Sequence, residues 1–403
     1  MIPLERHRNH LTPSKEVTHR ITTFQSNLKA MEVSLAWIDH LPDRYYFTGS
    51  IQDGVLLIPA EGEPFFFVRK SLSRAEVESP LKVLAYPGRR DLLKKIKGFL
   101  RVKDRIGMAM DVTPASLYVW LKEQVETCTL VDISRTLRLQ KAVKSAWEIA
   151  QIEKASQQAN TLFLEMNDHL RPGITELELS ASLEARLRIL GHSGVIRIRH
   201  SSSDLPILSV VSGDSALYPT NFDGPAGGEG PYPSSAAGSG WKTITDGETI
   251  MVDLVTAYNG YHADHTRTFF LGKNIPQKAQ TAHRFCIDVL DRLEQSLQAG
   301  QHCTEVFQRI HAWVKKQDPP EGFMGYGENR VKFFGHGIGL ELDEFPIIAD
   351  KTDLELASGM TIAMEPKAFL QGIGPVGLEN TYVITDKGCQ KFCTASYGIN
   401  RMS

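Results

Sequence analysis

The sequence of 403 residues lacks a long apolar run. A membrane-spanning helix needs roughly 18 or more consecutive apolar residues, and no stretch of the chain has them. The first residues, MIPLERHRNHLTPSKEV, carry charges throughout, so they also lack the apolar core of a signal peptide. We therefore expect a cytoplasmic protein that has no membrane partner.

Two further absences narrow the choice of ligand. The 45 basic and 47 acidic side chains give a formal charge of -2, so there is no excess of positive charge to hold nucleic acid. Residues 238–243, GSGWKT, resemble a phosphate loop only faintly, because Trp241 separates the glycine from Lys242 and Thr243. We expect neither nucleic acid nor a nucleotide as a partner.

Cysteines are few, and their spacing argues against the usual clusters. There are five, most of them far apart, and Cys389 and Cys393 do not have the CxxC spacing of zinc or redox motifs. We predict reduced thiols with a structural role.

A chain of this length favours two domains over one ordinary core. In the first 140 residues short apolar runs alternate with helix-length segments, which predicts an α/β domain. Residues 61–64, EGEP, are typical of a turn, so residues 54–70 should form a hairpin. We place the two domains at residues 1–140 and 141–403.

The second domain should begin with helices. Apolar residues recur at three- and four-residue steps from Ile149 to Met166, in a helix that Pro172-Gly173 would end. Thr175 and Glu178 form a capping box for the next helix. Residues 218–247 are crowded with Gly and Pro, and we interpret them as a long structured loop beside a site, with a flexible interdomain linker as the alternative.

The most informative segment is TIMVDLVTAYNGYHADHTRTFFLG, residues 249–272. Two strand-like runs flank Asn259-Gly260, the strongest short hairpin signal. If these two residues form a type I′ turn, Asp253 faces Thr266 across the strand pair and Asp264 projects from the same side. The two aspartates then become diagonal neighbours, close enough for their carboxylates to converge on metal ions.

Two acids on one buried face repel each other unless something neutralises them. Apolar flanking residues make burial the expectation, and a dry carboxylate pair needs a metal, a base or a shared proton. The alternative is that one aspartate pairs with Arg267 and the other is exposed. His262 and His265 have the parity of the opposite face, so we do not expect them to be ligands.

Two later segments supply three more donors. In FFGHGIGLELDEFP, Gly335 and Gly337 let a ligand approach His336 closely. In TIAMEPKAFLQGIGPVGLENTYVIT, two strand-like runs around a Gly/Pro turn would bring Glu365 and Glu379 together. Each residue alone is more often structural or exposed than ligating. With the aspartates they give four carboxylates and one imidazole, an oxygen-rich set suited to two divalent ions of Mn, Co, Fe or Zn.

At these residues the sequence resembles the pita-bread metallopeptidases, the family of prolidase, aminopeptidase P, methionine aminopeptidase and creatinase. The segments DLV, GYHADHTRTF, GHGIG, MEP and GLENT occur in the family's order over residues 250–385. The first 140 residues resemble the creatinase-type N-terminal domain more weakly. The resemblance implies an α/β N-terminal domain and an α+β catalytic domain whose helices cover a curved, mostly antiparallel sheet.

The resemblance also implies roles for individual residues. Asp264 and Glu379 would bridge two metal ions, and Glu365 would accept a proton as a metal-activated water attacks the scissile carbonyl. Thr266 would orient Asp253. The family's habit implies a homodimer. The complete set of metal ligands would be Asp253, Asp264, His336, Glu365 and Glu379.

Two positions depart from the family's pattern. Its peptidases usually have a substrate-binding histidine upstream of the first aspartate, but none occurs between His200 and His262. They usually have another seven residues after the ligand histidine, where this chain has Asp343. We treat Asp343 as a catalytic-site candidate that would repel an oxyanion and favour a positively charged substrate end. The candidates to replace the missing donors are Tyr218, Tyr232 and Tyr261.

We therefore expect a metallopeptidase, an Xaa-Pro aminopeptidase or Xaa-Pro dipeptidase that acts on small peptides with manganese or another divalent metal as its cofactor. One alternative is a metal-dependent lyase or non-peptide C–N hydrolase, because both departures change the substrate side of the site. The other is a non-catalytic binding module, which would predict the loss of metal ligands.

Overall fold

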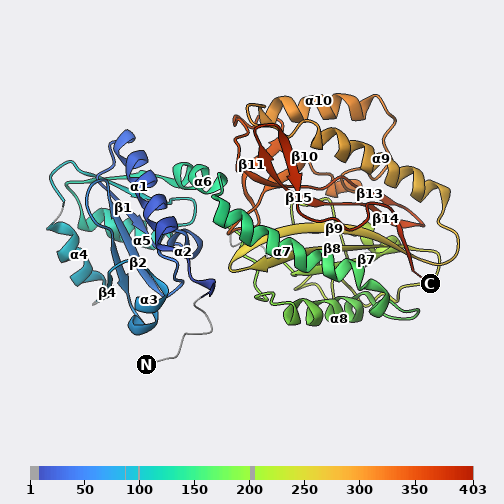
Figure 1. The fold of residues 1–403 in the computed structure, drawn as a ribbon, viewed down its shortest axis with the longest axis horizontal. Coiled ribbons are helices and arrows are strands. Elements are labelled where there is room, and N and C mark those ends of the chain that lie inside the picture. Colours follow the sequence, from blue (N-terminus) through green and yellow to red (C-terminus); the bar gives the residue numbers. More distant parts are fainter. Residues whose placement is uncertain (1–8, 87, 99, 200–204, 403) are drawn as a thin grey trace. The chain divides into compact units, whose positions relative to one another are not determined.

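The computed structural model describes residues 9–86, 88–98, 100–199 and 205–402. Contacts between residues divide the chain into two compact units, Met1–Lys141 and Ala142–Ser403, called here the N-terminal and C-terminal units. Each unit has its own sheets and apolar core (Figure 1). Among the described residues, no helix is both long enough and apolar enough to cross a membrane.

The N-terminal unit contains a six-stranded sheet in the order β4-β3-β2-β1-β5-β6. Gly54 lies opposite Val68 in an antiparallel pair, which confirms the predicted hairpin, while β1 and β5 run parallel. The α/β prediction is confirmed for this unit. The strands are β1 (Leu35–Ile38), β2 (Gly54–Pro59), β3 (Phe65–Val68), β4 (Val83–Ala85), β5 (Arg105–Met108) and β6 (Thr129–Asp132). The helices are α1 (Ser14–Ala30), α2 (Leu41–Thr48), α3 (Leu72–Glu78), α4 (Arg89–Lys97), α5 (Ala115–Gln124) and α6 (Ser134–Ala142).

In its described residues, the C-terminal unit has four α-helices besides short 3-10 helices, and three groups of paired strands, which are antiparallel except for β17 beside β9. The helices are α7 (Ala146–Leu164), α8 (Glu176–Ile189), α9 (Gln277–Glu294) and α10 (Cys303–Lys315). One sheet has the order β17-β9-β8-β7, with β7 (Leu208–Ser212), β8 (Thr249–Tyr258), β9 (Tyr261–Leu271) and β17 (Asn400–Met402). The second has the order β11-β10-β12-β15-β16, with β10 (Phe333–Gly337), β11 (Glu344–Ala349), β12 (Thr361–Met364), β15 (Asn380–Thr385) and β16 (Gly388–Lys391). The third group is the two-stranded pair of β13 (Lys367–Leu370) and β14 (Gly374–Gly377).

Two apolar cores hold the strands of this unit between its helices. One core packs α7 and α8 against β7, β8 and β9, and the other packs α9 and α10 against β10, β12 and β15. In Figure 1 the strands lie between α8 on one side and α9 with α10 on the other. The prediction of an α+β catalytic domain with mostly antiparallel strands is confirmed.

The helical part differs from the prediction at one boundary. Helix α7 ends at Leu164, a short 3-10 turn covers Met166–Asp168, and the chain reaches Pro172 in non-helical conformation. The capping box of Thr175 and Glu178 is confirmed at the start of α8. A second one, Ser145 with Glu148, begins α7.

The Gly- and Pro-rich segment 218–247 is a structured loop of the C-terminal unit. The strands that flank it, β7 and β8, are neighbours in one sheet, so the linker alternative is wrong. The Ser239 hydroxyl accepts a hydrogen bond from the Val210 amide at 2.7 Å, and the Glu176 carboxylate accepts one from the Gly240 amide at 3.2 Å. The loop is therefore tied to β7 and to the start of α8. The five cysteines are free, as predicted.

The predicted hairpin of β8 and β9 has the expected register. Tyr258 pairs with Tyr261 and Asp253 with Thr266. Asn259 and Gly260 have φ angles of 51° and 85°, the left-handed conformation that a type I′ turn requires at both central positions. The turn therefore places both aspartates on one face.

Replacing Gly260 with Val should lower the free energy of unfolding by about 1–2 kcal/mol, because a β-branched residue is strained at positive φ. Asp at position 259 tolerates the left-handed conformation, so Asn259→Asp is the control and should have little effect. Chemical denaturation measures both. Equal stability of G260V and the parent would show that this turn does not constrain the hairpin.

Candidate metal centre

Asp253 and Asp264 approach each other from the two strands of the β8–β9 hairpin. The Asp264 residue is 7% exposed, and its backbone amide donates to the Thr381 hydroxyl at 2.9 Å, which ties β9 to β15. The Thr266 hydroxyl lies 2.8 Å from Asp253 Oδ1 and 3.0 Å from Glu379 Oε2, so its single proton is shared between two acids. This matches the orienting role expected of Thr266.

The two glutamates face each other at the junction of two strand pairs. Met364 pairs with Asn380 on β12 and β15, and Lys367 pairs with Gly377 on β13 and β14. The same register places Glu365 opposite Glu379. A backbone bridge between Thr266 and Glu379 joins this junction to β9. The sequence-based expectation of one hairpin was too simple, because the run splits into four strands, but the two acids do come together.

His336 reaches the acids from the neighbouring strand β10. Its Nε2 atom lies 4.0 Å from Asp264 Oδ2 and 4.0 Å from Glu365 Oε1. One ligand atom each from Asp264, His336 and Glu379 lies within 4.8 Å of the others. All five sequence-predicted ligands therefore border one buried space.

The orientation of His336 leaves the metal-facing nitrogen free. Its Nδ1 atom lies 3.1 Å from the carbonyl oxygens of Gly337 and Leu342. Carbonyl oxygens only accept hydrogen bonds, so Nδ1 carries a proton in both charge states of the ring. In the neutral ring, Nε2 then has the lone pair that a metal needs.

A residue that sequence reasoning missed lies in the middle of the acids. The Lys367 ammonium is 2.8 Å from Glu379 Oε2, 2.9 Å from Glu365 Oε2 and 3.0 Å from Asp253 Oδ2, and its side chain is 2% exposed. The signal that could have found it is the spacing Glu365-x-Lys367, since side chains two apart in a strand share a face. Lysine is almost never fully buried unless it is paired.

The acids perturb one another strongly. Burial, followed by the charges of Glu379 and Asp253, raises the pKa of Asp264 well above its ordinary value. Burial likewise raises the pKa of Glu365 to about 7, against the lowering effect of Lys367. Burial lowers the pKa of Lys367, but Asp253, Glu365 and Glu379 outweigh it and raise this pKa well above its ordinary value. The cluster therefore holds more negative charge than its one lysine balances.

Two buried oxygens support the presence of a further cation. Asp264 Oδ1 and Glu379 Oε1 have no hydrogen-bond partner among the described residues. An unsatisfied buried carboxylate oxygen is costly. Together with the His336 Nε2 atom, these oxygens fit a divalent metal ion of the Mn, Co, Fe or Zn class.

Asp343 lies on the outer side of the histidine. Its Oδ1 atom is 3.6 Å from His336 Nδ1, and its side chain is 43% exposed. Burial lowers the pKa of His336, but the carboxylates of Asp343, Glu365 and Glu379 outweigh it and raise this pKa. Asp343 thus contributes negative charge at the solvent edge of the site.

Tyr261, His262 and His265 hydrogen-bond groups outside the carboxylate cluster. Tyr261 is buried and donates its hydroxyl proton to Glu148 at 2.9 Å, whereas Tyr218 and Tyr232 are exposed. The rings of His262 and His265 bond the Gly339 carbonyl and the Ser156 hydroxyl, as their opposite-face parity predicted. The alternative that paired an aspartate with Arg267 is wrong, because that guanidinium binds the carbonyls of Thr266, Glu379 and Ala395 and the side chains of Asn380 and Cys393.

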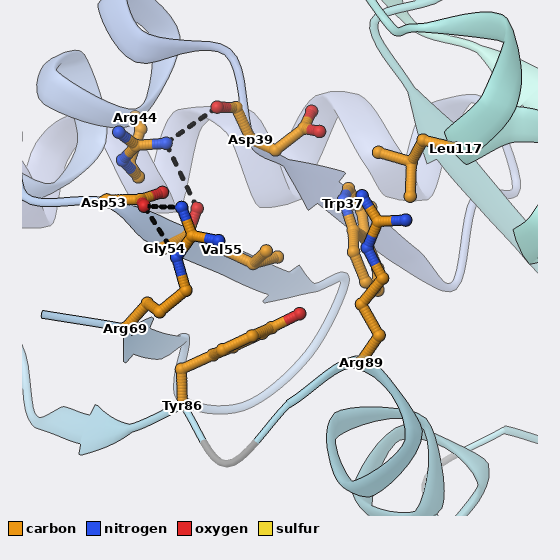
Figure 2. Close-up of a pocket in the computed structure, with 10 residues that line it drawn as sticks. All are labelled: Trp37, Asp39, Arg44, Asp53, Gly54, Val55, Arg69, Tyr86, Arg89 and Leu117. Atoms are coloured by element: carbon orange, nitrogen blue, oxygen red, sulfur yellow. Dashed lines mark hydrogen bonds and ion pairs between the residues drawn. The ribbon is translucent and has the colours of Figure 1, made fainter.

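The N-terminal unit contains a pocket of its own (Figure 2). The Arg44 guanidinium donates to the carbonyl oxygens of Asp39 and Gly54, and Arg69 pairs with Asp53. In Figure 2 the ring of Tyr86 lies between Arg69 and Arg89. Arg44 and Arg69 are therefore engaged with other groups of the pocket. Its lining residues are Trp37, Asp39, Arg44, Asp53, Gly54, Val55, Arg69, Tyr86, Arg89 and Leu117.

Comparison with known families decides the class of the protein. The model of metallopeptidase family M24 matches residues 150–386, which are more than half of the chain. This matched range includes all five proposed ligands. The chain belongs to metallopeptidase family M24. The model of the Creatinase/Prolidase N-terminal domain matches residues 20–143. The predicted resemblance is confirmed: this M24 protein is a metal-dependent peptidase, and its family implies divalent metal cofactors.

Relatives cover nearly the whole chain at low identity. An Xaa-Pro dipeptidase of Pyrococcus furiosus is 22% identical over 349 residues, which are 86% of this chain and 89% of that protein. An Xaa-Pro dipeptidase of Lactobacillus delbrueckii subsp. lactis is 25% identical over 391 residues, covering 92% and 96%. The solved Xaa-Pro dipeptidase from Bacillus anthracis has a TM-score of 0.80 at 22% identity, covering 96% and 100%. The X-Pro aminopeptidase from Thermotoga maritima has a TM-score of 0.77 at 22% identity, covering 94% and 99%, so both structures share this fold.

Thr266→Val should weaken metal binding roughly 10- to 100-fold, the usual effect of losing a residue that orients a ligand. Thr268→Val is the matched control: Thr268 is two positions along the same strand and buried, and its hydroxyl donates to the Gly377 carbonyl at 2.7 Å instead of to an acid. Titration calorimetry with Mn²⁺ measures both. An equal loss in the two variants would show that Thr266 acts only through the stability of the sheet.

Proposed function

We propose that this M24 peptidase cleaves the Xaa-Pro bond of small peptides, most readily dipeptides. The convergence of Asp253, Asp264, His336, Glu365 and Glu379 on one buried space carries the proposal. Relatives named Xaa-Pro dipeptidase support the substrate class, since their similarity extends over both units of the chain. The family's divalent metals are proposed to be Mn, Co, Fe or Zn because the donors are mainly carboxylate oxygens.

Four of the five donors, Asp264, His336, Glu365 and Glu379, face the space in which a metal would lie beside the scissile bond. A divalent ion in such a site polarises a carbonyl and lowers the pKa of a water molecule. Thr266 and Lys367 keep the carboxylates of Asp253 and Glu379 oriented, and the carbonyls at His336 Nδ1 fix the ring. The donor set could accommodate the two ions expected from the sequence only if Lys367 left its present position.

Glu365 is proposed to carry the proton during the reaction. Lys367 holds its Oε2 atom at 2.9 Å, whereas Oε1 faces the space beside His336 Nε2. Burial raises the pKa of this carboxyl group to about 7 when no metal is bound, and a bound divalent ion would lower it toward the carboxylate form that accepts a proton. The Glu365 carboxylate would accept a proton from the attacking water and pass it to the leaving amine.

The test is hydrolysis of Ala-Pro by the metal-loaded protein, with Ala-Ala as the comparison peptide. We expect cleavage of Ala-Pro that chelation abolishes and that Glu365→Gln reduces about 10²- to 10⁴-fold in kcat, since proton-transfer groups contribute on that scale. The surface variant Glu305→Gln should retain full activity. Absence of Ala-Pro cleavage with all four metals would contradict the proposed substrate class.

Asp343 is proposed to attract the free amino group of the substrate, because its half-exposed carboxylate lies at the edge of the centre. Asp343→Asn should raise KM for Ala-Pro about fivefold, as expected for an exposed charge interaction of roughly 1 kcal/mol. The control is N-acetyl-Ala-Pro, for which the variant should lose nothing. An equal change in KM for both peptides, measured by steady-state kinetics, would remove Asp343 from substrate binding.

A further inference from the structure

Backbone contacts with neighbouring segments fix the position of Lys367. Its backbone pairs with Gly377, and its carbonyl oxygen accepts a hydrogen bond from the Met324 amide at 2.8 Å. A Cβ atom at Gly377 would lie 2.6 Å from Lys367 Cα, so the two strands meet closely here. The ammonium enters the acid cluster from a fixed point on β13.

The oxygens of the two glutamates divide the cluster into two halves. The Lys367 ammonium donates hydrogen bonds to Glu365 Oε2 and Glu379 Oε2, and it also donates one to Asp253 Oδ2. On the other side, Glu365 Oε1 and Asp264 Oδ2 each lie 4.0 Å from His336 Nε2. Among the described residues, the buried oxygens without a partner include Asp264 Oδ1 and Glu379 Oε1. One half of the cluster therefore contains a cation, and the other contains free donor atoms.

A second ion would compete with the Lys367 ammonium for the same carboxylate oxygens. Four carboxylates carry -4, and the ammonium reduces this to -3. One divalent ion brings the cluster to -1. A second ion would bring it to +1 and would have to share the oxygens of Asp253, Glu365 and Glu379 with the ammonium at close range. Two cations competing for the same three oxygens repel each other strongly where water is excluded.

We propose that this enzyme binds one divalent ion through Asp264, His336, Glu365 and Glu379, and that the Lys367 ammonium takes the place of a second ion beside Asp253. The inference deepens the proposed function, on which it rests for the presence of a metal. It replaces the two-ion arrangement expected from the sequence. Lys367 then also neutralises part of the cluster before any metal binds, which a pair of metal ions cannot do.

The experiment is metal counting on the full chain after saturation with Mn²⁺ and removal of unbound ion. Inductively coupled plasma mass spectrometry should give one Mn per chain for the parent, and electron paramagnetic resonance should show an uncoupled ion. Lys367→Ala, which removes the competing charge and opens space, should bind two ions with an exchange-coupled spectrum. Lys367→Arg and the exposed-lysine control Lys315→Ala should remain at one.

Asp253→Asn gives a second test that does not require Lys367 to be changed. With one ion held by the other four donors, this variant should still bind one Mn per chain with an affinity within about tenfold of the parent. Two ions in the parent, none in the parent, or a Lys367→Ala protein that folds and still binds one ion would each overturn the proposal. Failure to cleave Ala-Pro while these stoichiometries hold would contradict the proposed function and leave the metal assignment intact.

Discussion

Four carboxylates in one buried space are the constraint on which the rest of this structure depends. Moving a charged group out of water costs several kcal/mol even after the protein relaxes, and like charges nearby add to that cost. The aspartates lie on the β8–β9 pair and the glutamates lie where the β12–β15 and β13–β14 pairs meet, so their repulsion would push these pairs apart. The Lys367 ammonium, which partly balances their charge, therefore stabilises the fold of the C-terminal unit as well as shaping its chemistry.

Hydrogen bonds from Thr266 and Arg267 fix the geometry around the acids. Thr266 reaches both Asp253 and Glu379, and its backbone also bridges to Glu379. Arg267, next along β9, donates to the carbonyl oxygen of Glu379 at 2.9 Å. These contacts join the two main sheets at the point where the carboxylates converge. A donor set held in this way is preorganised, which is what catalysis by electrostatic stabilisation requires.

The sequence predicted the aspartate half of the centre well and the glutamate half less well. Asn259-Gly260 sets the register of its hairpin, so simple counting places Asp253 opposite Thr266. The turn between Glu365 and Glu379, residues 371–373, joins β13 to β14, and both glutamates lie outside that hairpin, where the chain passes between β12–β15 and β13–β14. Glu365 and Glu379 face each other because Met364 pairs with Asn380 and Lys367 pairs with Gly377. The sequence does not reveal these two pairings.

Lys367 illustrates a further limit of sequence reasoning. A lysine in a strand is ordinarily assigned to a solvated face, because burial of an unpaired ammonium is costly. Here three carboxylates reverse that preference, and they come from residues as distant in sequence as Asp253. The end of α7 at Leu164 was also missed, since apolar periodicity continues to Met166 after the helix has ended.

We propose that one metal ion and the Lys367 ammonium together balance the charge of the four acids. Anomalous diffraction at the manganese edge from crystals soaked in Mn²⁺ tests it most directly. We expect one anomalous peak, bounded by Asp264, His336, Glu365 and Glu379, with the Lys367 side chain still contacting Asp253. Two peaks, with Lys367 displaced from the acids, would contradict it.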